Sequence, residues 1–213
     1  MKRIYISNNV IRRLPRYLRK LDDLTAEGEV RISSSELGRQ MNLTPSQIRQ
    51  DFSCFGEFGQ QGYGYNIASL REQINHILGG DRCYTAIQIG VGNLGHALIE
   101  NFSDIDNGIK LIAAFDKKEE TIGKQICGLN IQNGDFLNSF LLENHVDIVI
   151  LAVPRETAQE IVDQIAGTGI RGIWNFSNIE LFVGDSGVIV ENIHFSDSIK
   201  CLTYYLAEED DGV

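Results

Sequence analysis

The sequence predicts an α/β protein in which a small helical part precedes a parallel sheet with helices on its faces. Three observations support this prediction. Apolar residues before position 80 recur at helical spacing. From Tyr84 onward, short apolar runs alternate with amphipathic segments, as in parallel sheets. Between the two parts, "GGD" at 79–81 has the composition of a domain boundary.

Length and composition narrow the class of protein. A chain of 213 residues can form one large or two small domains, each with its own core. No apolar run approaches the roughly 20 residues of a membrane helix, and the basic start lacks the apolar stretch of a secretory signal. The four cysteines form no C-x-x-C pair, so we expect reduced, mostly buried thiols, a cytoplasmic location and no metal site.

Charge is divided unevenly along the chain. A net charge of −10 argues at first against binding to nucleic acid. Residues 1–80, however, hold 11 Lys and Arg against 8 Asp and Glu, whereas the rest of the chain holds 8 against 21. The first twenty residues contain seven basic side chains and no acidic one. This distribution indicates a local anion-binding surface, with a merely solvated basic helix face as the alternative.

The first predicted helix covers residues 10–24, where apolar residues recur every three or four positions. Pro15 removes one backbone donor, so we expect a kink or a restart there. A second helix opens at "SSSELGRQM", where Ser33 and Glu36 have the spacing of a capping box. A third follows in "TPSQIRQDFSCFG", with Thr44 as cap, Pro45 at the first helical position and Gly56 as its end.

The third helix has two different faces. Ile48, Phe52 and Phe55 recur at helical spacing and are expected to pack inward. The outer face then carries polar, amide and guanidinium groups suited to phosphates and base edges: Ser46, Gln47, Arg49, Gln50 and Ser53. Helix, short turn and capped helix with a polar outer face is the helix-turn-helix pattern, although any small helical subdomain could share it.

The glycine-rich "GEFGQQGYGYN" after the third helix predicts a tight two-stranded ribbon, which in this position is a wing. One more amphipathic helix, "IASLREQINHIL", leads to the boundary. We therefore predict a winged helix-turn-helix domain over 1–80. Its expected DNA contacts come from the basic first helix, the outer face of the third helix and the wing: Arg12, Arg13, Arg16, Ser46, Gln47, Arg49, Gln50, Gln61 and Tyr63.

The second part alternates strands and helices. Strands are predicted at 86–90, 110–115, 147–153, 172–176 and 188–191, and helices at 94–101, 135–143 and 155–166. A final helix over 196–206 places Ile199, Leu202, Tyr205 and Leu206 on one side. The acidic tail "AEEDDGV" is expected to be disordered.

The motif "GVGNLG" follows the first of these strands and opens a helix. Gly90 permits the tight turn, Gly92 lets the backbone approach a pyrophosphate, and Gly95 allows close helix–strand packing. Asp116 ends the next strand and is suited to hydrogen-bond an adenosine ribose, which favours NAD(H) over NADP(H). Lys117 and Lys118 qualify that preference, because they could accommodate a phosphate.

Two later strand ends complete the predicted cofactor site. "LAVPRE" places Val153 and Pro154 in a loop over the cofactor, and "WNFSN" lies at the sheet edge where ligands bind in open α/β folds. Asn175 could hydrogen-bond a nicotinamide amide, although ordinary strand-end packing explains both segments equally well. The full set of cofactor-binding residues is Gly90, Val91, Gly92, Asn93, Leu94, Gly95, Asp116, Val153, Pro154, Asn175 and Phe176.

A catalytic apparatus is not apparent in the sequence. The four histidines have no obvious acid or base partner in the sequence, and there is no Tyr-x-x-x-Lys or metal-spaced cluster. We therefore interpret the dinucleotide as a signal rather than a substrate, and the protein as a non-enzyme. A small NAD(P)-dependent oxidoreductase with a basic accessory domain remains an alternative, as does a constitutive DNA-binding protein whose nucleotide fold serves only dimerisation.

The order of "SSSELGRQMNLTPSQIRQDFSCFGEFGQQGYGYN", "IGVGNLGHAL", "AAFD", "AVPRETAQ", "GIRGIWNF" and "VENIHFSDSIKCLTYYL" resembles the bacterial redox-sensing repressors of the Rex family over about 10–206. The resemblance implies a homodimer whose winged helices read a palindromic operator. It also implies a Rossmann domain that senses the NADH/NAD+ ratio: NADH releases DNA and NAD+ opposes release. Residues 1–80 would form the winged-helix domain, 81–195 the Rossmann domain, and 196–213 a domain-swapped helix and tail.

The sequence departs from the family pattern at two places. Family members often carry an acidic residue after "VENV", which is thought to pair with an arginine of the first helix. Here His194 stands at that position, with Arg19 as the expected arginine. The segment "NFSN" also replaces the commoner "NFAP", which affects the expected nicotinamide contacts.

Overall fold

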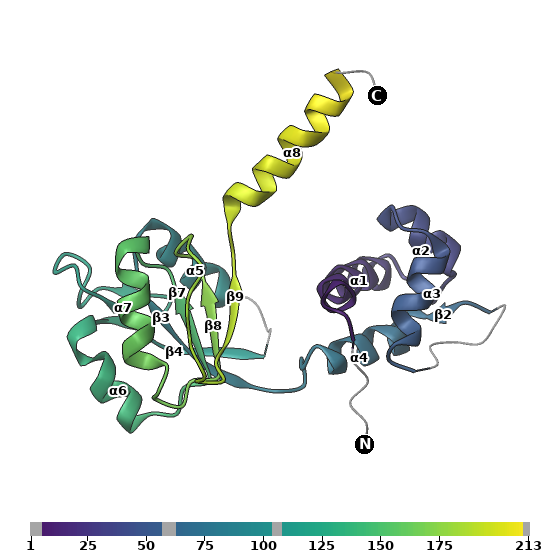
Figure 1. Ribbon diagram of the computed structural model, residues 1–213. Coiled ribbons are helices and arrows are strands. Elements are labelled where there is room, and N and C mark those ends of the chain that lie inside the picture. The colour runs from purple at the N-terminus through teal and green to yellow at the C-terminus, as the bar shows by residue number, and fades with distance from the viewer. Residues whose placement is uncertain (1–5, 57–62, 104–107, 211–213) are drawn as a thin grey trace. The chain divides into compact units, whose positions relative to one another are not determined.

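The structure, a computed structural model, describes residues 6–56, 63–103 and 108–210 (Figure 1). The chain divides into two compact units, residues 1–82 and 83–213. The division falls just after the "GGD" segment.

The N-terminal unit contains four helices and two short strands in its described part. They are α1 (Asn8–Ala26), β1 (Arg31–Ile32), α2 (Ser34–Met41), α3 (Pro45–Ser53), β2 (Tyr65–Asn66) and α4 (Ile67–Ile77). Helix α1 runs as one element through Pro15, which is exposed. The carbonyl that a proline deprives of its donor can therefore be solvated, and the predicted restart of the helix is wrong.

The turn between α2 and α3 is tight for identifiable reasons. Asn42 caps α2 in the left-handed conformation with φ 56°. A Cβ at Gly38 would lie 2.5 Å from the carbonyl oxygen of Leu43, so the turn can approach α2 only because this residue is glycine. Ser33 and Thr44 accept hydrogen bonds from the backbone of Glu36 and Gln47 at 3.0 and 3.2 Å, as predicted for N-caps.

An apolar core joins all the elements of this unit. Ile48 and Phe52 are buried and Phe55 packs against the same cluster, which confirms the predicted inward face of α3. The ring of Phe52 meets those of Tyr17 and Tyr65 edge-on, with centroids 4.9 and 5.2 Å apart. Strand β2 pairs antiparallel with β1, which precedes α2. The predicted ribbon thus takes one partner from 31–32, while residues 57–62 lie outside the described part.

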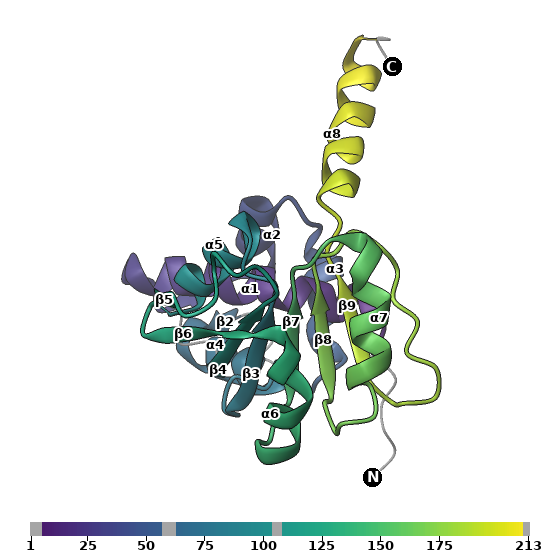
Figure 2. The same ribbon diagram turned by 90° about the vertical axis from the view of Figure 1, so that its left-hand side faces the viewer.

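The C-terminal unit is built on a seven-stranded sheet of order β5-β6-β4-β3-β7-β8-β9, seen in Figure 2. All neighbours are parallel except β5 and β6. The strands are β3 (Tyr84–Ile89), β4 (Ile109–Asp116), β5 (Gln125–Ile126), β6 (Leu129–Asn133), β7 (Ile148–Leu151), β8 (Gly172–Asn175) and β9 (Ile189–Asn192).

Helices cover both faces of the sheet. Helices α6 (Leu137–Glu143) and α7 (Arg155–Ile165) pack on one face, where they form the larger apolar core with β3, β4 and β7. Helix α5 (Asn93–Ser103) packs on the other face with β4, β5 and β6. A 3-10 turn, η1 (Gly134–Phe136), leads into α6. This arrangement confirms the predicted α/β class with a parallel sheet.

The last helix, α8 (Phe195–Asp210), leaves the sheet after β9 (Figure 1). Every side chain from 195 to 209 is exposed, including the apolar side predicted from sequence. Residues 207–210 continue the helix, so the expectation of a disordered tail is wrong for them. An acidic segment can extend a helix that is already nucleated by the residues before it.

Cys83, Cys127 and Cys201 are exposed and Cys54 is half-buried, so the expectation of mostly buried thiols is wrong, although all four are free. Within the described ranges, no helix is long and apolar enough to cross a membrane. The same residues contain no group of three or more His, Cys, Asp or Glu side chains that could hold a metal ion.

Candidate cofactor pocket and nucleic-acid interface

The glycine loop after β3 needs its three glycines for two different reasons. Gly90 has φ +89°, and a Cβ there would lie 2.4 Å from the carbonyl oxygen of Ala152. A Cβ at Gly95 would lie 2.1 Å from the carbonyl oxygen of Gly90. A Cβ at Gly92 would meet no atom within 4 Å. Gly90 and Gly95 are therefore required by the fold itself, whereas Gly92 leaves room beside the start of α5.

A pocket of about 500 Å³ opens at the carboxyl ends of β3, β4 and β7. It brings together eight of the residues predicted from sequence: Gly90, Gly92, Asn93, Leu94, Asp116, Val153, Pro154 and Phe176. Lys117 and Lys118 also line it. Asn93 and Leu94, at the N-terminus of α5, line the pocket. The first backbone N–H groups of a helix have no partner within the helix, which favours a bound phosphate.

Asp116 links the end of β4 to the glycine loop. One carboxylate oxygen accepts a hydrogen bond from the backbone N–H of Val91 at 2.7 Å, and the other accepts one from Lys118 N–H at 2.8 Å. A carboxylate has about four acceptor positions, so each oxygen can still accept a second donor from the pocket. Asp116 can therefore fix the loop and receive a ribose hydroxyl at the same time.

Three residues of the predicted set take structural positions instead. Val91 is 6% exposed and Gly95 is buried under the loop. Asn175 is fully buried: its amide nitrogen donates to Ile179 O and Asn192 Oδ1 at 2.7 and 2.8 Å, and its oxygen accepts from Ser177 N–H at 2.9 Å. These bonds engage both ends of the amide within the protein, so the geometry does not support the expected contact with nicotinamide.

The pocket wall also includes side chains outside the set predicted from the sequence. Thr157, Ile161 and Gln164 on α7 line it together. Their spacing of four and three residues places them on one face of a helix. That periodicity was visible in the sequence, but it could not show that this face turns toward the cofactor loop.

The candidate nucleic-acid interface lies on α3 and α1. Ser46, Arg49 and Gln50 are exposed on α3, and Arg12 and Arg16 are exposed on α1. Arg49 donates from Nη1 to the hydroxyl of Ser34 at 3.0 Å, which links α3 to the start of α2. Tyr63 is 71% exposed, and Gln61 lies outside the described residues.

Arg13 and Gln47, both predicted DNA contacts, bind a buried carboxylate. Asp51 is fully buried on the inner side of α3. It accepts hydrogen bonds from Arg13 Nε at 2.6 Å and Nη2 at 2.8 Å, from Tyr17 Oη at 2.7 Å, and from Gln47 Nε2 at 2.8 Å. Arg13 keeps 22% of its side chain exposed.

The network sets the charge state of its members. Burial by itself would raise the pKa of Asp51, but the hydrogen bonds from Arg13, Tyr17 and Gln47 outweigh it and hold the pKa below its ordinary value. Burial, followed by the bond to Asp51, raises the pKa of the Tyr17 phenol. Asp51 is therefore an acceptor-only anion at neutral pH, and α3 is fastened to α1 by a buried ion pair.

Comparison with known proteins agrees with this geometry. The family described as "Putative DNA-binding protein N-terminus" matches residues 5–53, and the family described as "CoA binding domain" matches residues 81–179. The redox-sensing transcriptional repressor Rex of Clostridium botulinum (strain Alaska E43 / Type E3) is 49% identical over 205 residues, which are 96% of this chain and 97% of that protein. The chain belongs to the Rex family.

Further Rex proteins and structures extend the match. Rex of Caldicellulosiruptor saccharolyticus is 47% identical, with 98% of this chain and 94% of that protein covered. A crystal structure of RSP with β-NAD+ and operator DNA has a TM-score of 0.89 at 44% identity, covering 97% of this chain and 94% of that one. RSP with β-NADH has a TM-score of 0.88 at 41% identity, with 96% of each chain covered.

His194, the departure from the Rex pattern, has partners within the C-terminal unit. Its Nε2 lies 3.1 Å from a carboxylate oxygen of Glu180, and its Nδ1 lies 3.2 Å from Oδ1 of Asn178. Asn192 also donates to Glu180, at 2.5 Å. These contacts link the residues just before α8 to the segment after β8. Arg19 belongs to the other unit, and its predicted relation to this position stays untested.

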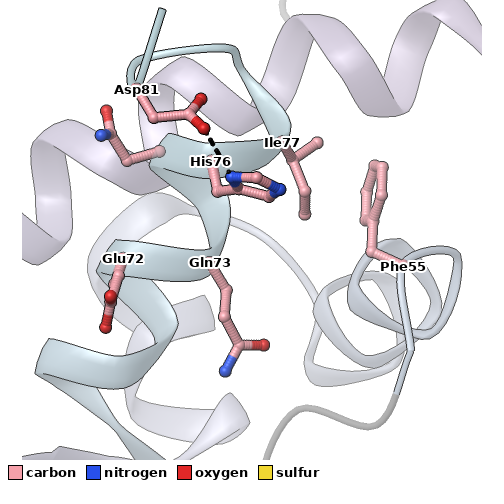
Figure 3. Close-up of a pocket in the computed structure, with 7 residues that line it drawn as sticks. Phe55, Glu72, Gln73, His76, Ile77 and Asp81 are labelled. Atoms are coloured by element: carbon pink, nitrogen blue, oxygen red, sulfur yellow. Dashed lines mark hydrogen bonds and ion pairs between the residues drawn. The ribbon is translucent and has the colours of Figure 1, made fainter.

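The N-terminal unit contains a second hollow, of about 710 Å³, beside the end of α4 (Figure 3). Phe55 and Ile77 provide apolar walls, and His76 pairs with Asp81 at 3.0 Å. Glu72 and Gln73 extend along α4 at its rim. None of these residues belongs to a site predicted from the sequence.

Proposed function

We propose that this protein is a transcriptional repressor that binds operator DNA through its N-terminal unit and senses the NADH/NAD+ ratio through its C-terminal unit. NADH releases the operator, and NAD+ opposes that release. One observation carries the proposal: a glycine-loop pocket and a helix-turn-helix occur in one chain, as in RSP, which was crystallised with operator DNA and β-NAD+ and with β-NADH.

The residues of the pocket fit a dinucleotide. The open space beside Gly92 accommodates a pyrophosphate against the N-terminus of α5. The carboxylate of Asp116 accepts hydrogen bonds from the hydroxyls of the adenosine ribose, and its negative charge disfavours a 2′-phosphate. Val153, Pro154 and Phe176 give the pocket apolar lining, which suits the nicotinamide end. The cofactor supplies the redox signal, and the protein supplies the difference in affinity between its two forms.

The N-terminal unit supplies the operator contacts. Helix α3 enters the major groove with Arg49, Gln50 and Ser46 toward the base edges, while Arg12 and Arg16 neutralise phosphates. Two copies bind a palindromic operator because a twofold dimer presents two such helices about one turn of DNA apart, roughly 34–36 Å. This activity takes place in the cytoplasm.

Dimerisation uses α8, whose exposed apolar side needs a partner. Phe195, Ile199, Leu202, Tyr205 and Leu206 are between 51% and 63% exposed. Covering this side with a second subunit, in a domain swap, would remove it from water. Truncation before Ser196 should therefore weaken the dimer and uncouple NADH from DNA. A truncated protein that sediments as a dimer and still releases DNA with NADH would contradict this role.

The direct test is an operator titration with NAD+ and with NADH at equal concentrations. The proposal predicts tight binding with NAD+ and at least about tenfold weaker binding with NADH, which corresponds to about 1.4 kcal/mol. Equal affinity in both titrations would contradict sensing, and no specific binding in either would contradict the repressor assignment. Because its relatives are named repressors, we also expect no turnover of NADH with alcohols or aldehydes.

A further inference from the structure

The amide of Gln47, on α3, has a defined orientation. Its Nε2 donates to Asp51 Oδ1 at 2.8 Å. Asp51 is ionised and can only accept hydrogen bonds, so the amide oxygen of Gln47 cannot take that position. Chemistry alone therefore decides which end of the amide meets the carboxylate, and the carbonyl oxygen must point away from it.

The other partners of Asp51 prevent the carboxylate from adjusting to Gln47. Both oxygens are held from α1, by the two nitrogens of Arg13 and by the hydroxyl of Tyr17. Asp51 is fully buried, whereas Gln47 is half-buried one turn earlier on α3. The carboxylate is therefore a fixed reference point, and the amide is set relative to α1 as well as to its own helix.

Two polar functions of Gln47 remain available for a ligand. Among the residues that the structure describes, none hydrogen-bonds to Oε1, and Nε2 keeps a second N–H. In the major groove, adenine presents an amino donor beside an N7 acceptor, whereas cytosine presents a donor without that acceptor. Guanine presents two acceptors, which cannot pair with a carbonyl oxygen. The available pair of functions matches adenine.

We propose that Gln47 reads the adenine of an A·T pair in each half-site, and that Asp51 is the positioning residue that holds its amide in the reading orientation. This inference rests on the proposed operator binding by α3. It adds a base identity and a mechanism by which a residue that never touches DNA contributes to specificity.

The test is selection from a pool of palindromic duplexes randomised in both half-sites, with the full-length protein and NAD+. The wild type should enrich adenine at one position in each half-site that Gln47→Ala no longer selects. Preferences at the other positions should persist. At that position, replacing the A·T pair should weaken wild-type binding about 5- to 150-fold and leave Gln47→Ala nearly unaffected.

Two variants separate positioning from folding. Asp51→Asn can turn either end of its own amide toward Gln47, so the adenine preference should relax even in protein that remains folded. Tyr17→Phe removes a different bond to the same carboxylate and leaves the bond to Gln47, so it should keep the adenine preference. If Tyr17→Phe relaxes the preference as much as Asp51→Asn, the positioning role is wrong.

The outcomes also separate this inference from the proposed function. Failure of the wild type to enrich any sequence would contradict the proposed repressor activity itself. Enrichment of a defined sequence that Gln47→Ala selects equally well would overturn the inference alone. A Gln47→Ala variant that binds all sequences more weakly by the same factor would show a phosphate contact, and would likewise overturn it.

Discussion

The two units hold their candidate functional elements in place by different means. In the N-terminal unit, α3 is fastened by buried charge, because Arg13 and Tyr17 of α1 hold Asp51 from within the core. In the C-terminal unit, the glycine loop is held by close backbone packing, because Gly90 and Gly95 lie directly against backbone carbonyl oxygens. A reading helix needs side chains in fixed orientations, whereas a cofactor loop needs the absence of side chains. The difference predicts different responses to substitution.

The largest effect is expected for Arg13→Ala. It leaves a buried carboxylate without its charged partner, which typically costs about 3–5 kcal/mol of unfolding free energy. Arg16→Ala, from the exposed side of the same helix, is the matched control and should change stability by less than about 0.5 kcal/mol. Amide hydrogen exchange in residues 6–56 measures both. Equal protection in the two variants would contradict the structural role of Asp51.

The C-terminal unit should respond in opposite ways to side chains added at two glycines. Gly95→Ala places a Cβ against Gly90 O and should destabilise the unit by about 1–3 kcal/mol. Gly92→Val should preserve stability but lower the affinity for NADH at least about tenfold, because the valine side chain would occupy the space of the pyrophosphate. Trp174, the only tryptophan, reports unfolding of this unit, and NADH fluorescence reports binding. Unchanged NADH affinity in Gly92→Val would remove the cofactor from this loop.

Within the nucleic-acid interface, substitutions of Arg49 and of Arg16 should affect DNA binding in different ways. Arg49→Ala should weaken operator binding by about 1–3 kcal/mol with little effect on unrelated DNA, if Arg49 contacts a base edge. Arg16→Ala should weaken all sequences alike and reduce the slope of log affinity against log salt by about 0.9. Titrations at several salt concentrations distinguish the two. Equal losses on operator and random DNA for Arg49→Ala would exclude α3 as the reader.

The smallest effect concerns pH. Because the pKa of Asp51 is lowered in the folded protein, its contribution to stability is fully present above the unfolded value of about 3.9 and is lost as pH falls through the folded value. The N-terminal unit should therefore lose stability below about pH 4, and Asp51→Asn should flatten that part of the profile. Urea unfolding followed by hydrogen exchange tests it. If Asp51→Asn leaves the dependence of stability on pH unchanged, another group must be responsible for the loss of stability at low pH.

The sequence predicted the architecture because its signals were local. Caps at Ser33 and Thr44, the inward face of α3 and the strand–turn–helix around "GVGNLG" each follow from residues a few positions apart. The strands β5 and β6 were missed because they are short and lie in a polar stretch, where alternation is weak.

The fine assignments of side chains were harder to predict because they depend on distant contacts. Arg13 and Asp51 are 38 residues apart in the chain, and nothing in the basic pattern of α1 distinguishes Arg13 from Arg12 or Arg16. Asn175 lies at the predicted sheet edge, but its bond to Asn192 comes from the neighbouring strand. The residue types at the sites and the sheet edge on which they lie could therefore be predicted from the sequence. The hydrogen-bond partners of each polar group could be identified only from the folded structure.

The central claim is that one chain couples the pocket at Asp116 and Gly92 to the reading face of α3. Coupling of two ligands is reciprocal, so a factor by which NADH weakens operator binding must equal the factor by which operator weakens NADH binding. The decisive measurement is the NADH affinity of the full-length protein with and without saturating operator duplex. The account predicts about tenfold weaker NADH binding in the presence of operator, or about 1.4 kcal/mol, matching the loss of operator affinity caused by NADH. An NADH affinity that is the same with and without operator would contradict it.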